Sequence, residues 1–156
     1  MENLNWGSLG TAGIAHEMGS ALKAVNGEIY AVCSTSIEKA ERYAKEFCVT
    51  KVYGSVEEML ADEKVDIVYI ATLHNSHYTF ILQALKAKKH VFCEKSITVN
   101  SRQLEECVAI AKENERIICD GTTLLHMPLY KKLKQLVQSG VIGDIKMIQV
   151  NFGSCK

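Results

Sequence analysis

The sequence predicts an α/β protein, built as a Rossmann-type doubly wound parallel sheet and followed by the truncated start of a second, α+β domain. Short runs of β-branched and aromatic residues alternate with amphipathic helical stretches. Several of these runs are almost continuously apolar, which is typical of strands covered by helices on both faces. A turn of small residues, 7–15, separates the first strand from the first helix. Together these observations favour a parallel sheet over an antiparallel sandwich.

Strands and helices are expected to alternate through residues 1–120, which we take as one nucleotide-binding domain. The strands are predicted at 4–9, 28–33, 51–54, 65–71, 90–93 and 116–120. The helices are predicted at 12–25, 36–47, 55–62, 77–87 and 101–114. Ser36, Ser55 and either Asn100 or Ser101 precede helical stretches and can cap their free N–H groups.

The alternation changes after Asp120. A helix is expected to begin near Pro128 and to end at Gly140, and an alternating strand is expected at 146–153. Residues 121–156 are therefore interpreted as the incomplete beginning of a second, C-terminal domain. The expected strand offers an edge for pairing, so we predict a homo-oligomer.

Composition limits the kinds of partner. The 156 residues carry 18 Lys and Arg against 18 Asp and Glu, so no net field favours nucleic acid or an anionic membrane. No apolar run approaches the roughly 20 residues that span a bilayer, and we expect a cytoplasmic protein. The cysteines form no CxxC or Cys/His cluster, which predicts reduced buried thiols and no metal site; they are Cys33, Cys48, Cys93, Cys107, Cys119 and Cys155.

The small-residue turn is a candidate phosphate site. The dinucleotide fingerprint G-x-G-x-x-G/A is matched by Gly10, Ala12 and Ala15, with alanine in place of the middle glycine. Small side chains allow the backbone and the helix N-terminus to approach a pyrophosphate. A tight strand-to-helix connection is the alternative interpretation. The predicted contact residues are Gly10, Thr11, Ala12, Gly13, Ile14 and Ala15.

The end of the second strand bears on the choice of cofactor. The fingerprint expects an Asp or Glu there to bind the ribose 2′-hydroxyl, and this chain instead has the segment 33–36, Cys-Ser-Thr-Ser. Without a carboxylate there is no repulsion of a 2′-phosphate, and the hydroxyls of Ser34 and Thr35 can donate to it. The segment therefore favours NADP over NAD.

Three longer segments carry a family resemblance: WGSLGTAGIAHEM, ATLHNSHYTFILQALKAKKHVFCEKSITVN and LVQSGVIGDIKMIQVNFG. They resemble the glucose-fructose oxidoreductase / inositol dehydrogenase / MocA family over essentially the whole chain. The segment at 93–96, Cys-Glu-Lys-Ser, resembles the Glu-Lys-Pro motif of that family, with serine in place of proline.

This resemblance implies roles for individual residues. It implies that Lys95 polarises the substrate or exchanges a proton with it, and that Glu94 contacts or orients the cofactor. It also implies that Thr72, Asn75 and His77, in the loop after the fourth strand, lie on the cofactor side. Family members usually carry a further catalytic residue, the substrate pocket and the subunit interface in a second domain, so the resemblance implies that residues 121–156 begin a domain for substrate binding and oligomerisation.

The leading hypothesis is an NAD(P)-dependent oxidoreductase that moves hydride to or from a hydroxyl or carbonyl carbon of a sugar, polyol or related small molecule. A sensor or regulatory module that binds NAD(P) without turnover is the main alternative. An S-adenosylmethionine-dependent transferase has no support in the second half of the chain.

Overall fold

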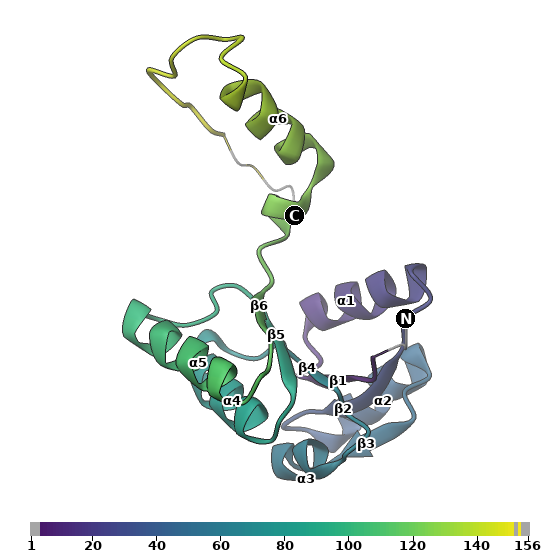
Figure 1. The fold of residues 1–156 in the computed structure, drawn as a ribbon. Helices are drawn as coiled ribbons and strands as arrows, with labels where there is room; N and C mark the ends of the chain where they lie inside the picture. The colour runs from purple at the N-terminus through teal and green to yellow at the C-terminus, as the bar shows by residue number, and fades with distance from the viewer. Residues whose placement is uncertain (1–3, 152, 154–156) are drawn as a thin grey trace. The chain divides into compact units, whose positions relative to one another are not determined.

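A computed structural model describes residues 4–151 and 153 of the chain (Figure 1). The chain divides into two compact units, 1–121 and 122–156. This division falls one residue after the boundary expected from the sequence.

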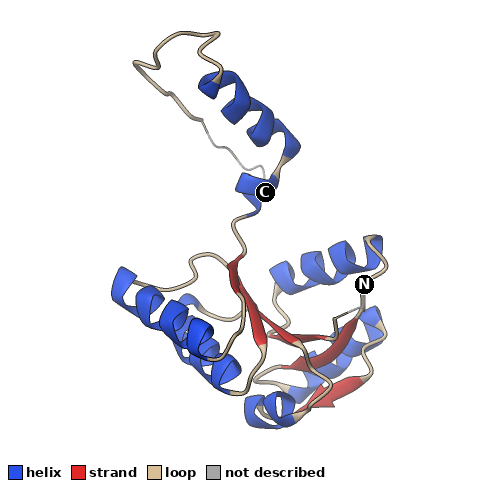
Figure 2. Ribbon diagram, viewed as in Figure 1, coloured by secondary structure: helices blue, strands red, loops and turns tan. Residues whose placement is uncertain are grey.

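The first unit contains a six-stranded sheet with the order β3-β2-β1-β4-β5-β6, in which all neighbouring strands pair in parallel. The strands are β1 (Trp6–Leu9), β2 (Ile29–Cys33), β3 (Lys51–Tyr53), β4 (Ile67–Ile70), β5 (His90–Cys93) and β6 (Ile118–Asp120). The connecting helices are α1 (Gly13–Ala24), α2 (Ile37–Phe47), α3 (Val56–Ala61), α4 (His74–Lys86) and α5 (Ser101–Glu113). The predicted Rossmann-type fold is confirmed (Figure 2).

Two apolar cores cover the two faces of this sheet. One core packs side chains of α3, α4 and α5 against β4 and β5, with Met59, Ile81 and Val91 fully buried. The other packs α1 and α2 against the opposite face, around Val32 and Tyr43. Because helices pack on both faces of the sheet, its strands carry apolar side chains on both sides.

The predicted caps are present. The Ser36 side chain accepts a hydrogen bond from the Lys39 amide, and the Ser55 side chain accepts one from Glu58. Of the two candidates before α5, Asn100 is the cap, and its Oδ1 lies 2.9 Å from the Gln103 amide nitrogen. Each cap satisfies an N–H group that lacks a partner within its helix.

One helix begins earlier than predicted. We expected the fourth helix from residue 77, whereas α4 begins at His74. The Ser76 hydroxyl donates to the Leu73 carbonyl oxygen over 2.7 Å and the Ser76 amide donates to the same atom over 2.9 Å. These bonds close a helical turn in a segment whose polar residues suggested a loop.

The second unit contains a 3₁₀ turn, η1 (Thr123–His126), and a helix, α6 (Pro128–Gln138). Pro128 occupies the first turn of α6 as expected, and Gly140 has a φ of 72° after the helix ends. The strand predicted at 146–153 is wrong for the residues that the structure describes, 146–151 and 153. Its alternating pattern meets no neighbouring strand among the described residues of this unit, and an unpaired strand leaves its backbone groups without partners. Phe152 lies outside the described residues.

In the described part of the chain, no helix is both long enough and apolar enough to cross a membrane.

Candidate functional site

The carboxyl ends of β1, β2 and β4 border a cavity of about 700 Å³. It lies where the strand order reverses, between β1 and β4, which is the usual place for ligands in open α/β sheets. Its volume is within the range of small-molecule sites. The predicted residues that line it are Gly10, Thr11, Ala12, Ser34, Thr35, Thr72 and Asn75.

Gly10 is required by the backbone of the turn. Its φ is +108°, and a Cβ placed on it would lie 2.5 Å from the carbonyl oxygen of Ala71. The Gly10 amide donates to the Cys33 carbonyl oxygen over 2.9 Å, so the turn is held between the ends of β2 and β4. Only glycine fits this close approach without strain.

Gly13 and Ala12 leave the first turn of α1 open. A Cβ on Gly13 would have no atom within 4 Å, so no protein atom accounts for the small side chain there. Ala12 precedes the helix without a side-chain cap. The free N–H groups of a helix N-terminus attract anions, so this turn can bind a phosphate.

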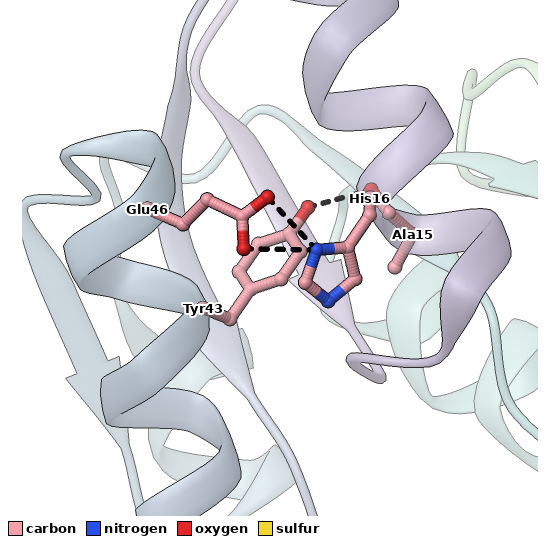
Figure 3. Close-up of polar contacts among 4 residues, drawn as sticks. All are labelled: Ala15, His16, Tyr43 and Glu46. Carbon is pink, nitrogen blue, oxygen red and sulfur yellow. Dashed lines mark hydrogen bonds and ion pairs between the residues drawn. The ribbon is translucent and has the colours of Figure 1, made fainter.

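A hydrogen bond and an ion pair connect α2 to that turn (Figure 3). The Tyr43 hydroxyl donates to the Ala15 carbonyl oxygen over 2.8 Å, and burial raises the pKa of Tyr43 to about 12. His16 Nδ1 lies 3.1 Å from Glu46 Oε2, and its ring packs edge-on against Tyr43. These contacts fix the position of the α1 N-terminus relative to α2.

Lys39 is a lining residue that the sequence reasoning missed. It lines the main cavity next to Ser34 and Thr35, and it also lines an adjoining hollow of about 400 Å³ with Arg42. Thr11 also lines both hollows, and its Oγ1 lies 3.4 Å from Ser34 Oγ. The sequence did carry a signal for this site: Lys39 and Arg42 are three residues apart on a predicted helix, and residues three apart lie on the same face.

The loop after β4 is ordered by its own side chains. The hydroxyl oxygens of Thr72 and Ser76 lie 2.9 Å apart, and Ser76 already donates to Leu73. Thr72 therefore donates in this pair, which leaves its hydroxyl oxygen as an acceptor. Asn75 is exposed and lines the cavity from the first turn of α4.

Lys95 and Glu94 lie outside the lining of the cavity, in the loop after β5. The Lys95 side chain is exposed, and the peptide bond between Lys95 and Ser96 is cis. Glu94 Oε1 accepts a hydrogen bond from Tyr69 over 2.8 Å, and burial together with this carboxylate raises the pKa of Tyr69. The tyrosine therefore remains a hydrogen-bond donor across the physiological range of pH.

His77, expected on the cofactor side, is instead fully buried. Its Nδ1 lies 2.9 Å from the Ser96 carbonyl oxygen and its Nε2 lies 3.1 Å from the Thr72 carbonyl oxygen. A ring enclosed in this way does not touch a ligand directly. Three further predicted residues also lie outside the cavity lining, namely Gly13, Ile14 and Ala15.

A parallel sheet of this order, with a glycine turn and a cavity where the order reverses, defines a dinucleotide-binding Rossmann domain. Residues 4–122 match the oxidoreductase family with an NAD-binding Rossmann fold, GFO_IDH_MocA. The chain belongs to this family of NAD(P)-binding oxidoreductases, as the resemblance of its motifs implied.

Similar proteins are dehydrogenases and reductases. A trans-1,2-dihydrobenzene-1,2-diol dehydrogenase of Xenopus laevis is 32% identical over 96% of this chain and 46% of its own length. The D-xylose 1-dehydrogenase (NADP(+)) of Hypocrea jecorina is 36% identical over 91% of this chain and 40% of its own. The 3-ketoreductase KijD10 of Actinomadura kijaniata, solved with NADP, aligns with a TM-score of 0.86 at 31% identity, covering 93% of this chain and 47% of that one. The chain thus spans slightly less than half the length of these relatives.

Proposed function

We propose that this chain forms the cofactor-binding part of an NAD(P)-dependent oxidoreductase. The reaction we propose transfers hydride between nicotinamide and a hydroxyl or carbonyl carbon of a sugar, polyol or related small molecule. The cavity at the carboxyl ends of β1, β2 and β4 is the observation that carries this proposal. The relatives, a diol dehydrogenase, a xylose dehydrogenase and a 3-ketoreductase, support the substrate class.

The cavity provides a suitable environment for each part of a dinucleotide. Residues 11–14 of the turn would offer backbone N–H groups to the pyrophosphate, since the Gly10 and Ala15 amides already donate to carbonyl oxygens. Val56, Leu73 and Phe80 supply apolar lining suited to an adenine ring. Thr72 and Asn75 also line the cavity and would contact the cofactor from the loop after β4.

We propose NADP as the preferred cofactor because of Lys39 and Arg42. Lys39 lines both hollows, Ser34 and Thr35 line the main cavity, and Arg42 lines the smaller hollow. The 2′-phosphate of NADP would bind the two cationic side chains and the hydroxyl donors there. The 2′-hydroxyl of NAD has no negative charge to pair with these cations. Glu46 also lines the smaller hollow, where its Oε2 lies 3.1 Å from His16 Nδ1.

Replacement of Lys39 tests this preference. Lys39→Met should weaken NADPH binding by roughly tenfold or more and leave NADH binding nearly unchanged. Lys45→Met is the matched control, because Lys45 is an exposed lysine of the same helix that lines neither hollow. Titrations that follow reduced-nicotinamide fluorescence measure the dissociation constants of both cofactors for the unaltered chain and the two variants. An equal loss for both cofactors would contradict the assignment of Lys39 to the 2′-phosphate.

We propose Lys95 as the catalytic residue. The nicotinamide would supply or accept the hydride, and the Lys95 ammonium would hold or exchange the proton on the substrate oxygen at Nζ. Glu94, held by Tyr69, would keep the turn that carries Lys95 in place.

The Lys95→Met variant separates an enzyme from a cofactor sensor. We expect Lys95→Met to retain NADPH binding and, in the full-length protein, to lose NADPH oxidation against a panel of sugar aldehydes and ketones. Lys88→Met is the control, since Lys88 is an exposed lysine before β5. Undiminished turnover in Lys95→Met would contradict the catalytic role.

We also propose that the protein acts in the cytoplasm as a homo-oligomer and binds no nucleic acid. The described cysteines are free thiols, which suits a reducing compartment. Leu129, Leu133 and Leu136 of α6 are exposed within their unit and would suit a protein contact. Light scattering over a range of concentrations tests the oligomer, and a strictly monomeric species would contradict it.

A further inference from the structure

The imidazole of His77 joins two loops that are separate in the chain. It projects from the first turn of α4, and its two nitrogens lie 2.9 Å from the Ser96 carbonyl oxygen and 3.1 Å from that of Thr72. Thr72 belongs to the loop 72–76, whose members Thr72, Asn75 and Ser76 line the main cavity. Ser96 directly follows Lys95. One ring therefore contacts both the cavity loop and the turn 94–96, here called the Lys95 turn.

The hydrogen-bonding nitrogens of His77, and not only the volume of its ring, explain why a histidine occupies this position. His77 is fully buried, and burial of an imidazole is costly unless its nitrogens find hydrogen-bond partners. Both neighbours are carbonyl oxygens, which only accept, so a neutral ring donates its single N–H to one of them, and only a ring protonated on both nitrogens donates to both. His74 makes a related contact, since its Nε2 lies 2.9 Å from the Lys95 carbonyl oxygen. Two histidines of one helical turn thus hold two consecutive carbonyl groups.

We propose that His77 is a positioning residue that holds the Lys95 turn through the Ser96 carbonyl and couples it to the loop that binds the cofactor. This proposal rests on the proposed function, in which Lys95 is the catalytic residue and the loop 72–76 contacts NAD(P). His77 acts through the backbone it holds and does not itself touch cofactor or substrate.

Two amide substitutions separate its two contacts. In His77→Asn the side-chain NH₂ takes the place of Nδ1 and can still donate to Ser96, whereas in His77→Gln it reaches the place of Nε2 and can still donate to Thr72. Amide hydrogen exchange is followed by NMR. The Glu94 and Lys95 amides report on the Lys95 turn, and the Ser76 amide reports on the cavity loop. We expect the Glu94 and Lys95 amides to exchange roughly tenfold faster in His77→Gln than in His77→Asn, with the reverse order at Ser76.

Equal exchange in the two variants would mean that the ring acts through its volume and would overturn the proposal, as would the opposite order. His90→Asn is the control, because His90 Nδ1 accepts from the Ile117 amide at the other end of β5. This variant should not change the exchange rates of the Glu94 and Lys95 amides relative to those of amides that exchange only by global unfolding. The ring nitrogen shifts of the unaltered chain test the contact without any variant, and an unprotonated Nδ1 would also overturn it.

Addition of NADPH tests the coupling. In the unaltered chain, bound NADPH should slow exchange at Lys95 several-fold, and in His77→Leu it should not. NADPH that binds both proteins and slows Lys95 exchange equally in both would overturn the coupling. Absence of NADPH binding would instead count against the proposed function, and the contrast between His77→Asn and His77→Gln, measured without cofactor, would still decide whether His77 holds the turn.

Discussion

The Tyr69 hydroxyl donates a 2.8 Å hydrogen bond to Glu94 Oε1 and connects the centre of the sheet to the Lys95 turn. The same hydroxyl oxygen lies 3.4 Å from the Ile14 carbonyl oxygen in the first turn of α1. The Tyr69 ring stacks on Phe92 with its centroid 5.7 Å away, so it has a fixed position from which to donate. The carboxylate beside the proposed catalytic lysine is therefore held by the sheet and not by the loop alone.

Removal of this hydroxyl should destabilise the chain. We expect Tyr69→Phe to lower the free energy of unfolding by about 1–2 kcal/mol, because a buried donor to a carboxylate is lost while the ring still packs. Urea unfolding followed by circular dichroism measures the change. Tyr78→Phe is the matched control, since Tyr78 donates to Glu106 on the exposed surface over 2.7 Å, and its effect should be smaller. An equal effect of both variants would contradict the special role of the Tyr69 contact.

The two glycines of the phosphate turn should respond differently to alanine. Gly10→Ala should cost at least about 2 kcal/mol of unfolding free energy, because its φ of +108° and the Ala71 carbonyl oxygen leave no room for a Cβ. Gly13→Ala should leave stability unchanged or raise it by up to about 1 kcal/mol, because its site is open and begins a helix. Thermal unfolding without cofactor compares them. Similar losses for both would show that the turn does not have this geometry.

Tyr43 should make the stability of the chain fall at alkaline pH. Burial raises its pKa from 10.0 to about 12, so the folded state retains a proton that the unfolded state loses above pH 10. The stability that this difference contributes is fully present below pH 10 and is lost as pH rises towards 12. Between pH 9 and pH 11.5, Tyr43→Phe should lose less stability than the unaltered chain, by on the order of 2 kcal/mol. Parallel losses in both proteins would contradict the assignment.

Most of the fold could be predicted because each strand carries its own signal. The runs at β2, β4 and β5 are apolar on both faces, so their burial is visible without knowledge of their partners. The run at 146–153 shows only that one face would be apolar. Whether it pairs depends on a neighbouring strand, which the pattern cannot supply.

The site was only partly predictable, because some of its residues are brought together by helix orientation. The turn 10–15 and the hydroxyls after β2 follow from their positions at strand ends. Lys39 was missed because its place in the cavity depends on how α2 turns relative to β2. His77 was assigned to the cofactor side because sequence spacing does not show which face of the first turn of α4 is buried.

We propose that residues 10–15, 34–39 and 72–76 together form one dinucleotide site. The most direct test of this proposal is an equilibrium titration of this chain with NADPH and NADH, followed by reduced-nicotinamide fluorescence. We predict saturable binding of one cofactor molecule per chain, tighter for NADPH than for NADH. Absence of saturable binding for both cofactors up to millimolar concentration would contradict the assignment of the cavity.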